Sequence, residues 1–104
     1  MKFKIYQIDG TLDAKHYKFN SSGVLPRKDG FPVADPAIYK QVYDGNLKVN
    51  CLESIFVAFN FDTRPQDFRG HSLSVSDVIA VEEGGDIAPG YYYCDIFGFT
   101  QVEF

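Results

Sequence analysis

A single stretch of helical periodicity stands in a chain that otherwise consists of short β-prone segments. The apolar positions of this stretch recur at three- and four-residue spacing: Leu52, Ile55, Phe56 and Phe59. Asn50 and Glu53 have the spacing of a capping box, which predicts that the helix starts at this point. Pro65 cannot continue a helix, so the helix should end within residues 60–65. One helix among strands indicates an α+β fold rather than repeated β-α-β units.

Strand chemistry fills most of the remaining chain. The segments rich in β-branched and aromatic residues are 2–8, 38–43, 46–49, 78–81, 91–97 and 99–104. Asp44-Gly45 predicts a hairpin between residues 38–43 and 46–49, and the strands that flank the Gly- and Pro-rich connection 82–90 should pair antiparallel. We therefore expect a single α+β domain over residues 1–104, with a mainly antiparallel sheet of about five strands and one packed helix.

Three shorter segments have their own local signals. Turn-forming residues are dense between residues 10 and 36, which predicts irregular loops with a short strand at 16–19. Ser74 and Asp77 have capping-box spacing, which predicts one helical turn that leads into the strand at 78–81. Gly98 should bend the chain before the last strand.

Charge is distributed unevenly along the chain. Residues 1–48 hold eight Lys and Arg against five Asp and Glu, whereas residues 49–104 hold two against nine. The acidic second half makes a duplex-DNA binder a poor expectation, so nucleic acid is an unlikely partner. It suits a protein whose acidic face meets a basic protein, or it serves solubility alone.

The ends and cysteines indicate a cytoplasmic protein with no membrane partner. The first residues lack the apolar segment of a signal peptide, and no apolar run has the length of a membrane span. Cys51 and Cys94 have no metal-ligand or redox-motif spacing, and we expect both to be buried thiols.

Residues 67–81 form the chemically richest stretch, yet they match no catalytic signature. His71 is followed by serines, but no Gly-x-Ser-x-Gly elbow is present. The best set of potential metal ligands, whose spacing fits neither zinc nor calcium sites, is Asp62, Asp67, His71 and Asp77. The glycine pairs lack phosphate-loop spacing. We predict no catalytic residue, no metal and no cofactor.

A protein partner is the better expectation, because Arg and Tyr are frequent anchors at interfaces. The tyrosines at 91–93 could stack on bases, but packing within the sheet is the stronger interpretation beside so many carboxylates. The residues that we select for partner contact are Asp67, Arg69, His71, Glu82, Glu83, Asp86, Tyr91 and Tyr93.

Several segments together resemble a known family, the YodL-like domain. They are KIYQID, YKQVYDGNL, LESIFVAFN, DFRGHSLSVSDVI and YYYCDIFGFTQV, which leave only about residues 10–37 outside the resemblance. Cys94 replaces the apolar residue usual before the aspartate. The resemblance implies a module carried by plasmids, phages and conjugative elements of Firmicutes, and it brings no catalytic residue. Proteins of this setting include counter-defence factors, so a host defence nuclease of the restriction or CRISPR type is the expected partner.

Two other functions stay open. A nucleic-acid-associated accessory domain would use the basic residues of the first third: Lys2, Lys4, Lys15, Lys18, Arg27 and Lys28. A small enzyme centred on His71 would need four side chains to converge in a cleft: Asp67, Arg69, His71 and Asp77.

Overall fold

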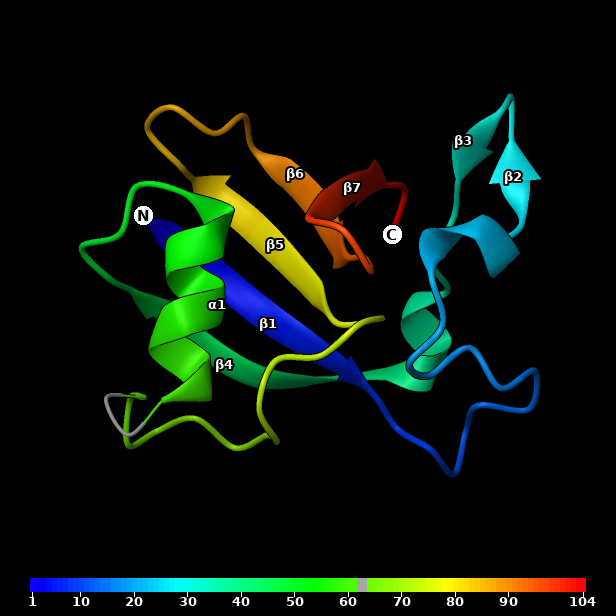
Figure 1. Cartoon of the computed structure of the whole chain (residues 1–104), viewed down its shortest axis with the longest axis horizontal. Helices are drawn as coiled ribbons and strands as arrows, with labels where there is room; N and C mark the ends of the chain where they lie inside the picture. Colours follow the sequence, from blue (N-terminus) through cyan, green and yellow to red (C-terminus); the bar gives the residue numbers. More distant parts are fainter. Residues whose placement is uncertain (62–63) are drawn as a thin grey trace.

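The architecture is a five-stranded antiparallel sheet with one helix on one face and an irregular segment on the other (Figure 1). The computed structural model describes residues 1–61 and 64–104. In chain order the elements are β1 (Lys2–Ile8), η1 (Ser22–Val24), β2 (Arg27–Lys28), β3 (Phe31–Pro32), η2 (Pro36–Ile38), β4 (Tyr39–Asn46), α1 (Leu52–Asn60), β5 (Val78–Glu83), β6 (Gly90–Cys94) and β7 (Phe99–Val102). The sheet order is β4-β1-β5-β6-β7, which confirms the α+β prediction.

The main core lies between the sheet and α1. Alternate residues of β1 point to this side, where Phe3 and Ile5 are fully buried. Ile55 and Phe59 of α1 meet them, and the Phe59 ring packs edge-on against Phe3 at 6.0 Å between centroids. Burial of this apolar face is what holds a nine-residue helix that would be marginal in water on its own.

A second, smaller core lies on the opposite face, beneath the segment between β1 and β4. Its buried members are Leu25, Ala34, Val78, Tyr93 and Val102. Phe104 closes this core near the chain end, with its ring 5.1 Å from the rings of both Tyr6 and Tyr39. The two faces of the sheet therefore have separate cores.

The hairpin predicted at Asp44-Gly45 is wrong. β4 continues through both residues to Asn46 and pairs antiparallel with β1, where Lys4 lies opposite Asp44 and Phe3 opposite Gly45. The Tyr43 ring lies over Gly45, at a point where the Cβ of any other residue would collide with it. The glycine is needed for this close approach and not for a turn.

The start of the helix also differs from the prediction. α1 begins at Leu52, and its N-cap is Cys51, without a side-chain bond to the helix backbone. Asn50 and Glu53 therefore do not form a capping box; instead Cys51 Sγ lies 3.0 Å from Ser54 Oγ. Cys51 is accordingly only half-buried, against expectation, whereas Cys94 is buried as predicted.

The strand predicted at residues 16–19 is absent, because a carboxylate folds this segment into turns. Asp13 accepts hydrogen bonds from the backbone N–H groups of Tyr17 and Lys18, both at 2.8 Å. His16 and Phe19 take up left-handed backbone with φ of 57° and 67°. Local side-chain acceptors thus outweigh the β propensity of Tyr and Phe.

The C-terminal predictions hold in outline. β5 and β6 pair antiparallel, and Gly98 bends the chain with φ of 71° between β6 and β7. β6 ends at Cys94, earlier than predicted. Residues 74–77 form a turn that is not helical, which differs from the prediction. In it, the backbone N–H of Ser74 donates to Asp77 Oδ2 at 2.9 Å.

Candidate functional site

The four residues of the enzyme alternative differ in burial. Asp67, Arg69 and His71 are exposed, whereas Asp77 is buried. The His71 ring bonds the neighbouring Ser72 carbonyl through Nδ1 at 2.7 Å and lies 6.3 Å from the Phe19 ring. No ion pair joins Arg69 to a carboxylate within residues 1–61 and 64–104.

The segment from residue 67 to residue 77 is connected to the sheet by hydrogen bonds of the buried Gln7 side chain, which belongs to β1. The Gln7 side chain accepts from the His71 N–H at 3.1 Å and donates to the His71 carbonyl at 2.8 Å. It also donates to Asp77 Oδ2 at 3.0 Å. Gly70 lies so close to the Gln7 amide that a Cβ would collide with it. The Arg-Gly-His-Ser motif therefore has a structural role that Gln7 and Gly70 explain, and sequence patterns gave no signal for this partnership.

Asp77 has an unusual environment for a carboxylate. Burial raises the pKa of Asp77 to about 7, although the hydrogen bonds from Ser74 and Gln7 act to lower it. Both donors bind the same oxygen, Oδ2. The Asp77 carboxylate is therefore buried and held by hydrogen bonds within the fold, whereas the His71 ring is exposed.

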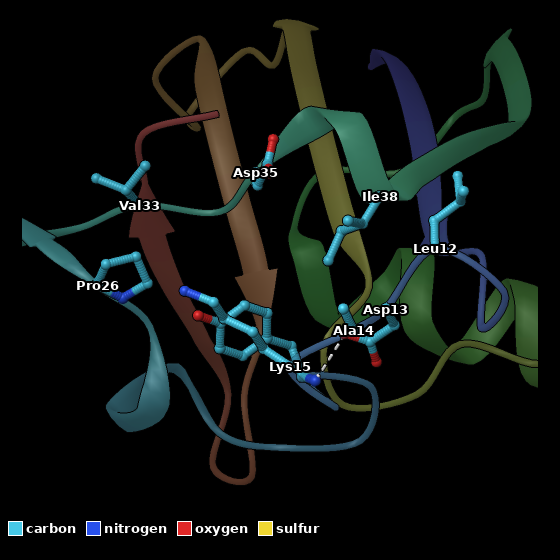
Figure 2. A pocket seen from close by; sticks show the side chains of 9 residues that line it. Leu12, Asp13, Ala14, Lys15, Pro26, Val33, Asp35 and Ile38 are labelled. Carbon is cyan, nitrogen blue, oxygen red and sulfur yellow. Dashed lines mark hydrogen bonds between the residues drawn. The ribbon is translucent and has the colours of Figure 1, made fainter.

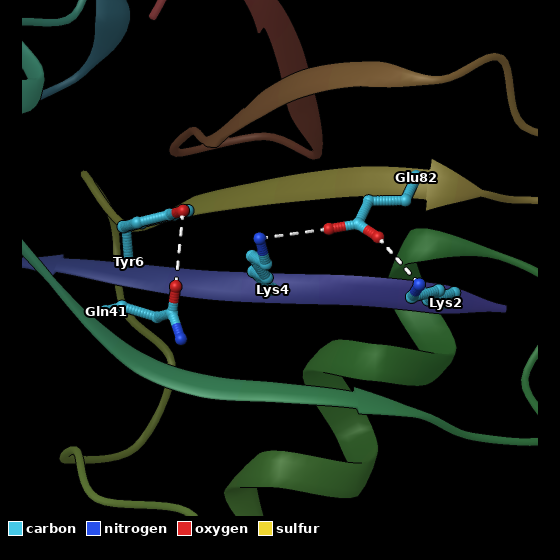
Figure 3. Close-up of polar contacts among 5 residues, drawn as sticks. All are labelled: Lys2, Lys4, Tyr6, Gln41 and Glu82. Atoms are coloured by element: carbon cyan, nitrogen blue, oxygen red, sulfur yellow. Dashed lines mark hydrogen bonds and ion pairs between the residues drawn. The ribbon is translucent and has the colours of Figure 1, made fainter.

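The predicted acidic surface is interrupted at Glu82. Its carboxylate lies between two lysines of β1, 3.3 Å from Lys2 Nζ and 3.2 Å from Lys4 Nζ (Figure 3). These bonds lower the pKa of Glu82 and raise that of Lys4. Glu83 and Asp86 remain exposed. The basic and acidic halves of the chain thus interleave, because β1 and β5 are neighbours in the sheet.

The two tyrosines predicted to contact a partner differ in their exposure to solvent. Tyr93 is fully buried and donates through its hydroxyl to the Asn20 carbonyl at 2.6 Å, so it cannot touch a partner. Tyr91 is 38% exposed, and its ring lies 5.2 Å from Phe104. Only Tyr91 stays available as a contact residue.

The basic residues of the nucleic-acid alternative are spread over several elements. Lys2 and Lys4 are paired with Glu82, and Lys28 Nζ lies 3.7 Å from Glu103. Lys15 borders a hollow of about 340 Å³ within residues 12–38 (Figure 2). The apolar wall of this hollow comes from Leu12, Ala14, Pro26, Val33 and Ile38, and its carboxylates are Asp13 and Asp35. Its mixed charge gives no track for a phosphate backbone.

A metal site is not formed within the described ranges, where no cluster of three or more His, Cys, Asp or Glu side chains could hold an ion. Asp62, a member of the predicted ligand set, lies outside the described residues. Burial raises the pKa of the Cys94 thiol well above its ordinary value, which makes this cysteine unreactive.

A group of exposed apolar side chains lies around the turn between β6 and β7 and on α1. Phe97 at the turn is 94% exposed and Ile96 beside it 61%. Val57 and Phe56 of α1 are 55% and 39% exposed. We call these four residues the apolar end. The sequence analysis did not predict this surface, because it assigned Phe56 to the core face of the helix and Ile96 and Phe97 to a strand. The available signal was that α1 has apolar residues on more than one of its faces.

The turn of the apolar end is held rigidly by Asp95. The Asp95 carboxylate accepts from Thr100 Oγ1 at 2.7 Å, from the Ile96 N–H at 3.1 Å, and from both the N–H and the hydroxyl of Ser22. Partial burial acts to raise the pKa of Asp95, but these hydrogen bonds outweigh it and hold the pKa below its ordinary value. Phe97 is therefore presented to solvent on an ordered turn.

Comparison with known proteins identifies one family. The model of the YodL-like domain matches residues 2–104, so the chain belongs to this family over almost its whole length, including residues 10–37 that the initial resemblance left out. No curated protein and no solved structure matches the chain. Among the described helices, none combines the length and apolar character that a membrane span requires.

Proposed function

With membership of the YodL-like domain family as the premise, we propose that this protein is a non-enzymatic protein-interaction module. The observation that carries the proposal is Phe97, which is 94% exposed on a turn fixed by the Asp95 carboxylate. An aromatic side chain held in place loses little freedom on binding, which is a property of interface anchors. Beside it, Ile96 lines one hollow together with the exposed Phe56 and Val57 of α1, which adds further apolar surface.

The partner that we propose is a basic host protein that handles nucleic acid. The chain carries a net charge of −4, and opposite charge speeds association with a basic surface and favours it over acidic competitors. In its specific form the proposal is a counter-defence inhibitor of a phage, plasmid or conjugative element that acts in the cytoplasm on a restriction or CRISPR nuclease. The family resemblance and the acidic balance support this form.

Affinity capture from a lysate of the host organism tests the proposal. Wild-type protein should retain a basic nucleic-acid-handling protein, and nuclease treatment should leave the recovery unchanged. Phe97→Ser should lose at least about tenfold in recovery, because it removes the anchor. Phe31→Ser is the matched control, since Phe31 is also exposed but lies in β3. Recovery of no protein, or recovery that disappears with nuclease, would contradict the proposal.

A further inference from the structure

β7 is an edge strand whose backbone is only partly paired. The Asp95 N–H donates to the Gly98 carbonyl at 2.9 Å, and hydrogen-bonded pairs alternate from there along the β6–β7 hairpin. Thr100 and Val102 consequently bond to β6, whereas Phe99, Gln101 and Glu103 direct their N–H and C=O groups away from it.

Among the backbone groups that the structure describes, only those of the last outward position, Glu103, are paired. The Glu103 N–H donates to the Pro32 carbonyl at 3.0 Å, and the Glu103 carbonyl accepts from the Ala34 N–H at 2.8 Å. Within residues 1–61 and 64–104, no backbone group bonds to the outward groups of Phe99 and Gln101. This is an open stretch of sheet edge, long enough for an extended segment to pair with it.

An apolar groove adjoins the open edge at Phe99. The groove has a volume of about 310 Å³ and is lined by Glu53, Phe56, Val57, Cys94, Asp95, Ile96, Gly98 and Phe99. A second hollow of about 420 Å³ on α1 shares Glu53 and Val57 with it, so the concave surface continues along the helix. A side chain that leaves an added strand toward α1 would enter this groove.

The charged groups that line the groove are all negative. Glu53 and Asp95 border it, and no Lys or Arg of the described residues lines either hollow. Asp95 is held by hydrogen bonds within the fold, whereas Glu53 is exposed and has no cation at ion-pair distance in the described part of the chain. The occupant should therefore carry a positive charge toward Glu53.

We propose that the open edge of β7 and this groove form a strand-addition site for an extended segment of a partner protein. The segment would pair with Phe99 and Gln101, place apolar side chains in the groove at alternate positions, and bring a Lys or Arg to Glu53. A second copy of this chain fits less well, because it would bring the same acidic groups to the interface. The inference rests on the proposed function and identifies the surface and the partner chemistry.

Selection from a phage-displayed library of random peptides tests the site directly. Enriched peptides should share apolar residues at positions i and i+2, because these two side chains lie on the same face of a strand. They should also carry a Lys or Arg next to this pair. Val57→Asp should weaken binding at least about tenfold, because it places a charge in the groove. Glu53→Lys should remove the preference for basic residues. Leu12→Asp is the control: Leu12 is exposed but does not line the groove, so this variant should bind the peptides as the wild type does.

Backbone methylation of a selected peptide distinguishes strand addition from simple apolar contact. An N-methyl group blocks a hydrogen bond, so methylation at alternate residues should abolish binding while methylation at the residues between should be tolerated. Binding that is indifferent to every N-methyl group, an acidic consensus, or the absence of any enriched peptide would each overturn the inference. Self-association of the wild type that Val57→Asp abolishes would identify a second copy as the occupant and overturn it too.

Failure of the site and failure of the proposed function give different results. Capture of the same host protein by wild type and Val57→Asp would leave the function standing and refute the strand-addition site. Peptides that bind as expected, together with a lysate from which nothing is captured, would support the site and refute the function. Circular dichroism of Val57→Asp and Glu53→Lys tests whether both variants are folded.

Discussion

The two faces of the sheet are covered in different ways. On one face, α1 contributes Ile55 and Phe59 to a core of fully buried apolar residues. On the other, the segment between β1 and β4 buries few apolar side chains and is held by hydrogen bonds to specific polar atoms. These run from Tyr93 Oη to Asn20 O, from Phe19 N to Ser76 Oγ, and from Ser22 N to Asp95. Each residue of the apolar core contributes to the stability of the whole domain. Each of these hydrogen bonds, which we call anchors, can instead be removed by a single substitution without disturbing the apolar core.

The difference predicts two modes of unfolding. Loss of apolar packing beneath α1 should lower the global free energy of unfolding, because helix and sheet form a single cooperative unit. Loss of an anchor on the other face should release the covering segment locally while the sheet stays folded.

The largest effect is expected from Phe59→Ala. The Phe59 ring is fully buried and packs against Phe3, Tyr43 and Phe68, with centroid distances of 4.8 to 6.0 Å. Its removal leaves a cavity and should lower the free energy of unfolding by about 3–5 kcal/mol. Urea unfolding followed by both circular dichroism and tyrosine fluorescence measures it; the two transitions should coincide. Separate transitions would show that the α1 face is not cooperative with the sheet.

The next effect is a pH dependence that originates at Asp77. Its pKa rises from an ordinary 3.8 to about 7 on folding, so the folded state binds more protons between these values. The stability from this group is complete below pH 3.8 and is lost as the pH rises to about 7, on the order of 4 kcal/mol in total. Asp95, with a lowered pKa, acts oppositely and only at lower pH.

Asp77→Asn is the control for this pH dependence. An asparagine oxygen in the place of Oδ2 can accept from both Ser74 and Gln7, so the geometry is retained without the charge. Urea midpoints measured from pH 4 to pH 8 should fall for the wild type and stay flatter for the variant. Equal slopes would mean that the Asp77 carboxylate does not titrate in this window.

A smaller and local effect is expected from Tyr93→Phe. The substitution removes the hydroxyl that donates to the Asn20 carbonyl and should cost about 1 kcal/mol. Hydrogen exchange should accelerate in residues 19–25 and remain unchanged in β1 and β5. Tyr92→Phe is the matched control, because its hydroxyl bonds the Ala88 carbonyl at an exposed site. Equal acceleration throughout the sheet would refute the idea of a separable cover.

The smallest effect on stability is expected from Phe97→Ser. The side chain is almost fully exposed, so its loss should change the free energy of unfolding by no more than about 0.5 kcal/mol. Thermal melting compared with Phe31→Ser measures this. A large destabilisation would place Phe97 in the fold and weaken its assignment as an interface anchor.

Short-range patterns predicted much of the fold but little of the candidate site. The strands at 2–8, 78–81 and 99–104 and the helix near residue 52 follow from periodicity, which reports burial on one face. Periodicity does not show which strands pair with each other. Asp44-Gly45 was predicted to form a turn because the strand that actually pairs with this segment, β1, lies more than thirty residues earlier in the chain. The exposure of Phe97 depends on Ser22 and Asp95 meeting across the molecule, which no local motif records.

β1 lies inside the sheet between β4 and β5, and this position has a consequence for the growing polypeptide. On the ribosome β1 is made first, yet one of its edges finds a partner only when Tyr39–Asn46 has emerged, and the other only when Val78–Glu83 has. Phe3 and Ile5 must stay exposed until these partner strands have emerged, which makes nascent chains that end before β5 prone to aggregation.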